Sequence, residues 1–186
     1  MSLSQSNLKP QISLRAATLA DVDVLLEIVH SAYRGGVATV SWKNENHIVQ
    51  GPRIKKPQME QIIQSSDASI RVAELDNGEL GGCALVDKHG EGVVHIGMIA
   101  VDPGKQNLGL GKSLIQDAED YARERFKATT AKMYVLNGRP ELMAWYNRLG
   151  YAETGHTEPF PSSEGGSQAL NDDAHLIEIS KAIAAV

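Results

Sequence analysis

Residues 93–113 read VVHIGMIAVDPGKQNLGLGKS, and this stretch decides the fold. Its first part, 93–101, is an apolar, β-branched run of strand length, and Asp102-Pro103-Gly104 ends that run with turn residues. A loop with glycines at 109 and 111 follows, and a segment with helical periodicity comes after it. This order of strand, glycine loop and helix is typical of a phosphate site, because the loop backbone allows close approach and the first helical N–H groups lack partners within the helix.

Three phosphate-binding patterns share this outline, and individual residues separate them. The dinucleotide fingerprint needs a glycine at position 114, which is leucine. The P-loop needs one at position 106, which is glutamine, although Gly111-Lys112-Ser113 matches its end. The pattern Gln/Arg-x-x-Gly-x-Gly/Ala fits at Gln106, Gly109 and Gly111 without a departure. A tight strand-to-helix connection that binds no ligand is the alternative until the flanking sequence is considered.

The length and composition predict a single domain over residues 1–186. Apolar residues make up 42% and charged residues 22% of the chain, as in an ordinary globular protein. We expect residues 1–10 to be a frayed N-terminus, because they are polar. Residues 159–173 are rich in Pro, Ser, Gly and Asp and are expected to form a mobile loop.

Charge and cysteine content narrow the functional class. The formal net charge is −5, so no overall positive field attracts nucleic acid. Cys83 is the only cysteine, which excludes an intrachain disulfide and suits a reducing compartment. No apolar run reaches the roughly 20 residues of a membrane span. We therefore expect a cytoplasmic protein, with a nuclear location left open, and neither nucleic acid nor a membrane as a partner.

Hydrophobic periodicity predicts an α/β fold with a mixed sheet. Residues 69–75, 79–86 and 93–101 form an antiparallel meander, and a crossover helix after the glycine loop makes the strand at 132–136 parallel to the strand at 93–101. Gly81-Gly82 and Gly97 mark expected bulges. The other expected elements are strands at 12–15, 151–154 and 176–179, and helices from the Thr18–Asp21 capping pair to about Arg34, from Pro57 onward, and at 141–149.

Two stretches outside the loop extend the pattern. The strand Tyr134-Val135-Leu136 ends in Asn137, and a short helix carries Tyr146 just before Gly150-Tyr151. Together with the loop, they resemble the core of the GNAT superfamily of acyl-CoA-dependent N-acyltransferases, over about residues 12–157. The resemblance implies a central sheet with an antiparallel meander and a splayed parallel strand pair, flanked by helices. The sequence does not specify the oligomeric state, and a homodimer is compatible with the resemblance, since GNAT relatives often form dimers.

The resemblance implies acetyl-CoA as the acyl donor, in the crevice between the strands at 93–101 and 132–136. Main-chain groups of Ile99 to Val101 would pair with the pantetheine arm, and the loop would supply N–H groups to the pyrophosphate. Asn137 either bonds to the amide arm or caps the helix at Glu141. The implied cofactor-binding residues are Ile99, Ala100, Val101, Gln106, Asn107, Leu108, Gly109, Leu110, Gly111, Lys112, Ser113, Asn137 and Tyr146.

The implied reaction is direct attack of a primary amine on the thioester in a ternary complex. The amine, with a pKa near ~10, must lose a proton, and the departing thiolate, with a thiol pKa near ~8.5, gains one. Tyr146 resembles the family's general acid, and its alternative is a core position in the helix. His95 is the candidate base, since an imidazole titrates near ~6.5. A buried, hydrogen-bonded histidine is the alternative, and the other candidate bases are Glu45, Glu153, His156, Glu158 and a water chain.

The acceptor is expected to be a small-molecule or peptide amine. Trp42, Glu45 and Arg53 lie in the aperiodic region that lines the acceptor pocket in relatives, although a solvated loop is the alternative. The histidines have no metal-ligand spacing with Cys83, so no metal is expected. Cys83 lies away from the glycine loop, so a cysteine-linked intermediate is not expected. A non-catalytic acyl-CoA sensor and a P-loop-like nucleotide-binding protein are the competing functions.

Overall fold

The computed structural model describes residues 11–35, 45, 47–161 and 167–183. The predicted frayed segment 1–10 lies outside this range. The described elements are β1 (Ile12–Ala16), α1 (Val22–Arg34), β2 (Val49–Gln50), α2 (Lys56–Gln64), β3 (Ala68–Leu75), β4 (Leu80–Lys88), β5 (Val93–Val101), α3 (Leu110–Phe126), β6 (Thr130–Leu136), α4 (Pro140–Arg148), β7 (Ala152–Pro159), β8 (Gln168–Ala169) and β9 (His175–Ala182), with single 3-10 turns at Leu19–Asp21 and Pro103–Lys105.

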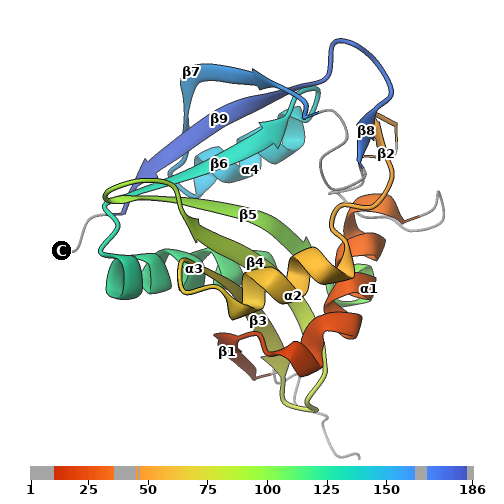
Figure 1. Ribbon diagram of the computed structural model, residues 1–186, viewed down its shortest axis with the longest axis vertical. Coiled ribbons are helices and arrows are strands. Elements are labelled where there is room, and N and C mark those ends of the chain that lie inside the picture. Colours follow the sequence, from red (N-terminus) through yellow and green to blue (C-terminus); the bar gives the residue numbers. More distant parts are fainter. Residues whose placement is uncertain (1–10, 36–44, 46, 162–166, 184–186) are drawn as a thin grey trace, which may run out of the picture.

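A mixed seven-stranded sheet in the order β1-β3-β4-β5-β6-β9-β7 forms the centre of the fold, as Figure 1 shows. The predicted meander is confirmed as antiparallel β3, β4 and β5, and the predicted parallel pair is confirmed as β5 and β6. A helix between two strands of one sheet reverses the chain, so the strand after α3 runs parallel to β5. The fold class predicted from the sequence is therefore correct.

Two features of the C-terminal half differ from the expectation. The strand expected at 151–154 continues to Pro159, and β9 inserts between β6 and β7 by pairing antiparallel with both. The segment expected to be a loop at 159–173 contains β8, which pairs with β2. The pattern in residues 159–173 is dominated by turn-forming residues, which conceal a two-residue strand whose partner lies more than a hundred positions earlier.

Helices cover both faces of the meander. On one face α1 and α2 pack on Ile70, Val72 and Ala100, and on the other face α3 packs on Val86 and Ile96 among others. Val22, Leu25, Val29 and Met59 supply the buried side of the first face, and Leu110, Leu114, Ala118 and Ala122 supply that of the second. This alternation follows from the two-residue period of the strands and the helical spacing of the apolar positions.

The two expected bulges are present. In β4, Ala73 pairs with Gly82 and Glu74 with Leu80, so Gly81 is the extra residue. In β5 the pairing passes from Gly97 to Ala100, opposite Leu85 and Cys83, with Met98 at φ 45° between them. Ile96 faces α3, whereas Met98 faces α1, although the two residues are two positions apart and would share a face in a regular strand. The bulge therefore reverses which side chains of β5 point to which face.

A buried ion pair links α3 to the C-terminal strands. Glu119 is 2% exposed, its carboxylate accepts hydrogen bonds from the Tyr151 hydroxyl at 2.9 Å and from Lys181 Nζ at 2.8 Å, and Lys181 belongs to β9. A buried carboxylate needs such partners, because removing its hydration shell costs roughly several kcal/mol if no hydrogen bond replaces the water. Glu119 thus holds β9 and the residue before β7 against the helix that follows the glycine loop.

Candidate active site

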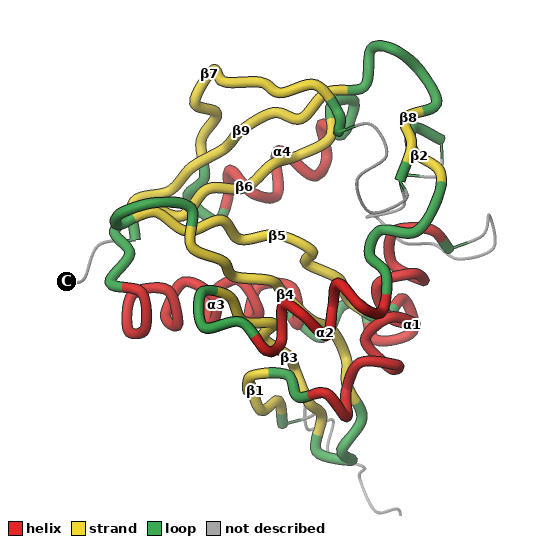
Figure 2. The backbone as a smooth tube through the Cα atoms, viewed as in Figure 1, coloured by secondary structure: helices red, strands yellow, loops and turns green. Residues whose placement is uncertain are grey.

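Strands β5 and β6 separate after three paired residues. Val93–His95 pairs with Thr130–Lys132, and no register between the two strands continues past these residues. Figure 2 shows the two strands diverging from this point. The bulge at Met98 follows on β5, so the edge of β5 from Ile99 to Val101 that faces β6 has no neighbouring strand in the described part of the chain. The Ile99 carbonyl accepts a hydrogen bond from the Tyr33 hydroxyl at 3.0 Å, and the other main-chain groups of this edge are available to an extended ligand.

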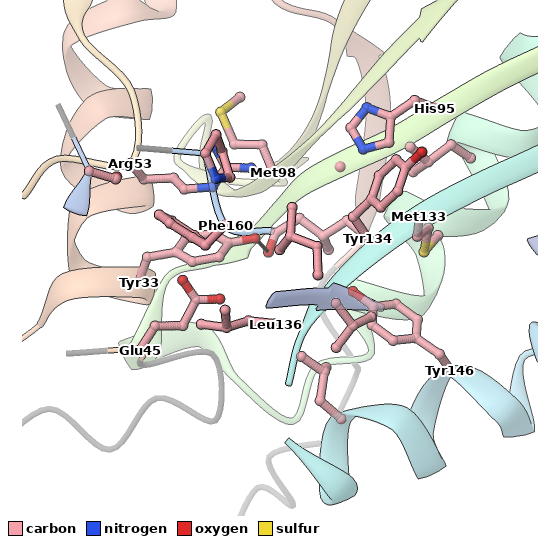
Figure 3. Close-up of a pocket in the computed structure, with 18 of the residues that line it drawn as sticks. Tyr33, Glu45, Arg53, His95, Met98, Met133, Tyr134, Leu136, Tyr146 and Phe160 are labelled. Carbon is pink, nitrogen blue, oxygen red and sulfur yellow. Dashed lines mark hydrogen bonds between the residues drawn. The ribbon is translucent and has the colours of Figure 1, made fainter. Parts of the chain in front are cut away.

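A cavity of about 210 Å³, which we call the central cavity, lies between the separated strands. Figure 3 shows four of the predicted site side chains around it: Glu45, Arg53, His95 and Tyr146. They come from a loop after α1, a loop before α2, β5 and α4, which are far apart in the sequence. The fold therefore brings the predicted acid, the predicted base and two predicted acceptor-pocket residues to one place.

Tyr146 lies on α4 and is 4% exposed. Its ring packs against Trp145 and Tyr151, with centroid separations of 5.0 Å and 6.2 Å. Burial raises the pKa of the Tyr146 hydroxyl well above its ordinary value of 10, because the site has little water to solvate a phenolate. The phenol is therefore a hydrogen-bond donor at neutral pH. Tyr146 is both a buried core residue of α4 and a residue of the cavity wall. Burial in the core therefore does not exclude a role of Tyr146 in the reaction.

His95 is the last residue of β5 that pairs with β6, and its ring lies on the wall of the central cavity. Nδ1 is 3.0 Å from Oδ1 of Asp87, the β4 residue that pairs with His95 of β5. A carboxylate accepts hydrogen bonds, so Nδ1 carries the proton and Nε2 is the basic nitrogen of the neutral ring. An ideal Cβ on Gly97 would lie 2.9 Å from Nε2 and 2.6 Å from Cε1. Only glycine leaves room for this ring position.

Two further groups adjoin the His95 ring. The ring of Tyr134 lies 5.6 Å away, and burial together with a hydrogen bond to Glu178 raises the pKa of Tyr134 to about 12. Lys132, opposite His95 on β6, donates to Glu178 at 3.1 Å. Tyr134 is therefore uncharged at neutral pH, and the charge of Lys132 is compensated by Glu178. Asp87 is the carboxylate that contacts the imidazole itself.

A second cavity opens along the glycine loop, and we call it the loop cavity. Gly109 has φ 80°, a left-handed conformation that strains other residues, and it precedes α3. The first bond within α3 runs from Ser113 N to Gly109 O, so the N–H groups of Leu110, Gly111 and Lys112 have no partner within the helix. Most of the predicted loop residues line the cavity, together with Trp145 and Arg148: Val101, Gln106, Asn107, Gly109, Leu110, Gly111 and Lys112.

Residues 37–151 match the model of the acetyltransferase (GNAT) family. The chain belongs to this family. The match includes the glycine loop and α4, so the resemblance read from the sequence is confirmed and the P-loop interpretation of Gly111-Lys112-Ser113 is wrong. The protein is a GNAT acetyltransferase, and the family uses acetyl-CoA as its acyl donor.

Solved GNAT N-acetyltransferases share the fold at low sequence identity. The ribosomal-protein-S18-alanine N-acetyltransferase from Escherichia coli is 17% identical, with a TM-score of 0.68, over 95% of this chain and 96% of that chain. The spermidine/spermine N-acetyltransferase SpeG from Vibrio cholerae, in complex with manganese ions, is also 17% identical, with a TM-score of 0.65 over 93% of both chains. At these identities the likeness concerns the fold, and neither acceptor carries over to this enzyme.

Ser113, Asn137 and Trp42, three predicted site residues of this GNAT enzyme, are not among the described residues that line either cavity. Ser113 does not line the loop cavity; it lines a separate groove with Leu14 of β1 and with Gln116 and Asp117 of α3. Asn137 does not cap α4, because its amide donates to Asp173 O at 3.0 Å and its Oδ1 accepts from His175 N at 3.1 Å. Trp42 lies outside the described residues. The cofactor roles of Ser113 and Asn137 remain predictions.

The structure adds three GNAT site residues that the sequence did not reveal. Tyr33 and Arg34, at the end of α1, line the central cavity, and no periodic pattern distinguishes them from other buried positions of a helix. Asp87 faces His95 because β4 continues to Lys88 and pairs antiparallel with β5. The sequence placed Asp87 in the turn at 87–92, and the expected strand ends would have paired Val86 with Val93, so this register was not predicted.

The described residues give no further sign of a metal or a membrane. They include no cluster of three or more His, Cys, Asp or Glu side chains arranged to hold a metal ion. None of the described helices is both long and apolar enough to cross a membrane.

Proposed function

We propose that this GNAT enzyme transfers an acetyl group from acetyl-CoA to a primary amine by direct attack in a ternary complex. In this proposal His95 is the general base, Asp87 is its positioning residue and Tyr146 is the general acid. The observation that carries the proposal is the presence of a basic imidazole nitrogen and a buried phenol on the wall of one cavity, beside the unpaired edge of β5.

The loop cavity fits the diphosphate of acetyl-CoA. The residues at the start of α3, whose N–H groups lack partners within the helix, line this cavity, and its charged lining residues are Lys105, Lys112 and Arg148 against one carboxylate, Glu141. Gln106 Nε2 is buried without a hydrogen-bond partner, and a phosphate oxygen would satisfy it. Main-chain groups from Ile99 to Val101 would then hold the pantetheine arm. Bound in this way, acetyl-CoA supplies the acetyl group as a thioester at the central cavity.

The two titratable residues divide the proton transfers between them. His95 Nε2 takes the proton that the amine loses as its nitrogen forms the new bond to the acetyl carbon. Tyr146 donates a hydrogen bond to the sulfur as the carbon–sulfur bond breaks, and the thiolate ends as the thiol. Asp87 stabilises the imidazolium and keeps the ring in the tautomer that leaves Nε2 free to accept.

The environment of Cys83 supports direct transfer without an acetyl-cysteine. Its side chain is fully buried in β4 against α1, and burial raises the pKa of the thiol to about 12. A protonated, inaccessible thiol is a poor nucleophile. The proposal therefore needs both substrates to be bound at once.

The base is tested by Asp87→Asn. The asparagine amide donates to Nδ1 or leaves it unpaired, so the tautomer with a proton on Nε2 becomes favoured and the base is lost. We expect kcat to fall by about 10²-fold or more, with the Kd for coenzyme A unchanged and an altered acid limb in the pH profile. A control, Asp67→Asn, removes a carboxylate that pairs with exposed Lys88 outside both cavities. An unchanged pH profile for Asp87→Asn would remove Asp87 and His95 from the mechanism.

Cofactor binding is tested separately by calorimetry with coenzyme A. Gly109→Val places a β-branched residue at φ 80° and should abolish the heat of binding. Gly78→Val imposes a similar strain at φ 81° in the β3–β4 turn and should retain it. Wild-type protein that binds coenzyme A but releases no thiol with any amine would be a sensor and not an enzyme of the proposed kind.

A further inference from the structure

Arg53 is a cation on the wall of the central cavity, and among the described residues it forms no ion pair. Its guanidinium lies over the ring of Tyr33, 5.6 Å from the ring centroid (Figure 3). Stacking on an aromatic ring holds the guanidinium in place while its N–H donors stay available.

Tyr33 fixes Arg53 relative to the reaction centre. The Tyr33 hydroxyl donates to the carbonyl oxygen of Ile99 at 3.0 Å, at the bulge of β5. Burial raises the pKa of Tyr33, so this donor stays protonated. A guanidinium on Tyr33 is therefore tied to the strand edge that would carry the thioester, with the cavity between Arg53 and Tyr146.

The charges of the described lining favour an anion over a second cation. Glu45 is its one carboxylate, and Glu45 Oε2 accepts from Arg34 at 3.1 Å, while Arg139 lies 4.0 Å from Oε1. Glu45 is thereby neutralised by a buried arginine, and Arg53 supplies one positive charge in excess. An ammonium group would find no unpaired carboxylate among the described residues of the lining, whereas a carboxylate would find a planar, bidentate donor.

We propose that the acceptor is an amine that also carries a carboxylate, and that Arg53 binds this carboxylate. This inference rests on the proposed function and names its substrate class. The reacting amine lies between Arg53 and the thioester, near His95, and Met98, Leu136 and Phe160 give the cavity an apolar wall for the rest of the molecule. The excess positive charge also favours the neutral form of the bound amine, which is the form that reacts.

The test compares matched acceptors by acetyl-CoA-dependent thiol release. The pairs are L-leucine with 3-methylbutylamine and L-phenylalanine with 2-phenylethylamine, and spermidine is the polycation. We expect the carboxylate-bearing member to have a kcat/KM about 10- to 100-fold higher, as charged hydrogen bonds give, and spermidine to be the poorest acceptor. Arg53→Gln should remove that preference through KM, leaving the KM for acetyl-CoA unchanged, and Arg53→Lys should restore part of it.

Lys55→Gln is the control. Lys55 is two residues from Arg53 in the sequence, and the substitution removes one positive charge from a side chain that does not line the cavity. It should keep the preference. Equal or better turnover of the carboxylate-free amines, or a preference that survives in Arg53→Gln, would overturn the proposal while the proposed function stands. Absence of turnover with every amine, spermidine included, would count against the proposed function and this proposal with it.

Discussion

Replacing Gly97 with alanine should displace His95 from its place in the central cavity. The new Cβ would lie 2.6 Å from Cε1 and 2.9 Å from Nε2 of the imidazole. Non-bonded carbon atoms prefer separations of about 3.5–4.0 Å, so the ring must move by about 1 Å. Apart from the two chain neighbours of Gly97, the third nearest atom, Nδ1 at 3.6 Å, also belongs to His95, so no other described residue comes closer than that. The close contacts that the substitution creates are therefore contacts with His95.

The magnitude follows from what a catalytic base loses when it moves. A misplacement of about 1 Å costs about 10²-fold in rate, which corresponds to about 2.7 kcal/mol of transition-state stabilisation. The same motion weakens the hydrogen bond to Asp87, which is 3.0 Å long in the native position. Overpacking at one site destabilises a protein by about 1–3 kcal/mol, so the free energy of unfolding must be measured on the same sample.

The assay is a double-mutant cycle on kcat for thiol release, at saturating acetyl-CoA. His95→Ala should lower kcat by about 10²- to 10⁴-fold, and Gly97→Ala by about 10²-fold. With the ring removed, the alanine at 97 has room, so the double variant should match His95→Ala in both kcat and stability. The coupling energy is then about 2–3 kcal/mol, of the size found for residues in contact. Gly104→Ala is the control, because its Cβ would meet nothing closer than 3.5 Å.

Two results would refute this reasoning. A folded Gly97→Ala enzyme with the wild-type kcat would show that the position of the His95 ring does not matter to the reaction. A double variant whose kcat falls by the product of the two single effects would show that Gly97 acts independently of His95, through the backbone of β5 or through the cofactor.

Two other predictions concern Tyr146 and Asp21. Tyr146→Phe should lower kcat by about 10²-fold with little change in the Kd for coenzyme A by calorimetry, and the raised pKa of the phenol means that no alkaline limb of the wild-type profile should belong to it. A hydrogen bond from Arg15 lowers the pKa of Asp21 from 3.8 to about 2, so this carboxylate stabilises the fold above about pH 4 and the stabilisation is lost as the pH falls toward 2. Asp21→Asn should lower the free energy of unfolding at pH 7 by about 1 kcal/mol in urea titrations, given the partial exposure of Arg15, and the deficit should vanish near pH 2.

The sequence predicted most of the sheet because its strands obey local rules. The period of two, the turn residues at 76–78 and 87–92 and the crossover helix are sufficient to specify β3 to β6 and their directions. The position of β9 between β6 and β7 was not predictable in this way, since β9 pairs with β6 across about forty residues of chain and with β7 out of sequence order. Strand order depends on tertiary packing, here helped by Glu119 and Lys181.

The site was predictable where chemistry depends on spacing. Gly109 and Gly111 are needed at fixed distances from a helix start, and Tyr146 at a fixed distance from Gly150, so a single sequence carries that information. The partner of Glu45 is different, because no sequence period relates Arg34 to Glu45 and only the tertiary structure brings the two side chains together. Ser113 shows the converse: it belongs to the pattern in the sequence, yet α3 turns it away from the loop cavity.

The bulge at Met98 accounts for the arrangement of the whole site. With regular pairing throughout β5, Met98 would lie on the same face as Ile96, and Ile99 would face α1. The extra residue reverses this order, so that Ile99 turns its carbonyl to Tyr33 while the strand edge leaves β6. Gly97, immediately before the bulge, gives His95 the space to lie over the backbone. One irregularity in one strand therefore positions the proposed base, the aromatic support of Arg53 and the open strand edge proposed for the cofactor, which is why Gly97→Ala should lower activity through the position of His95.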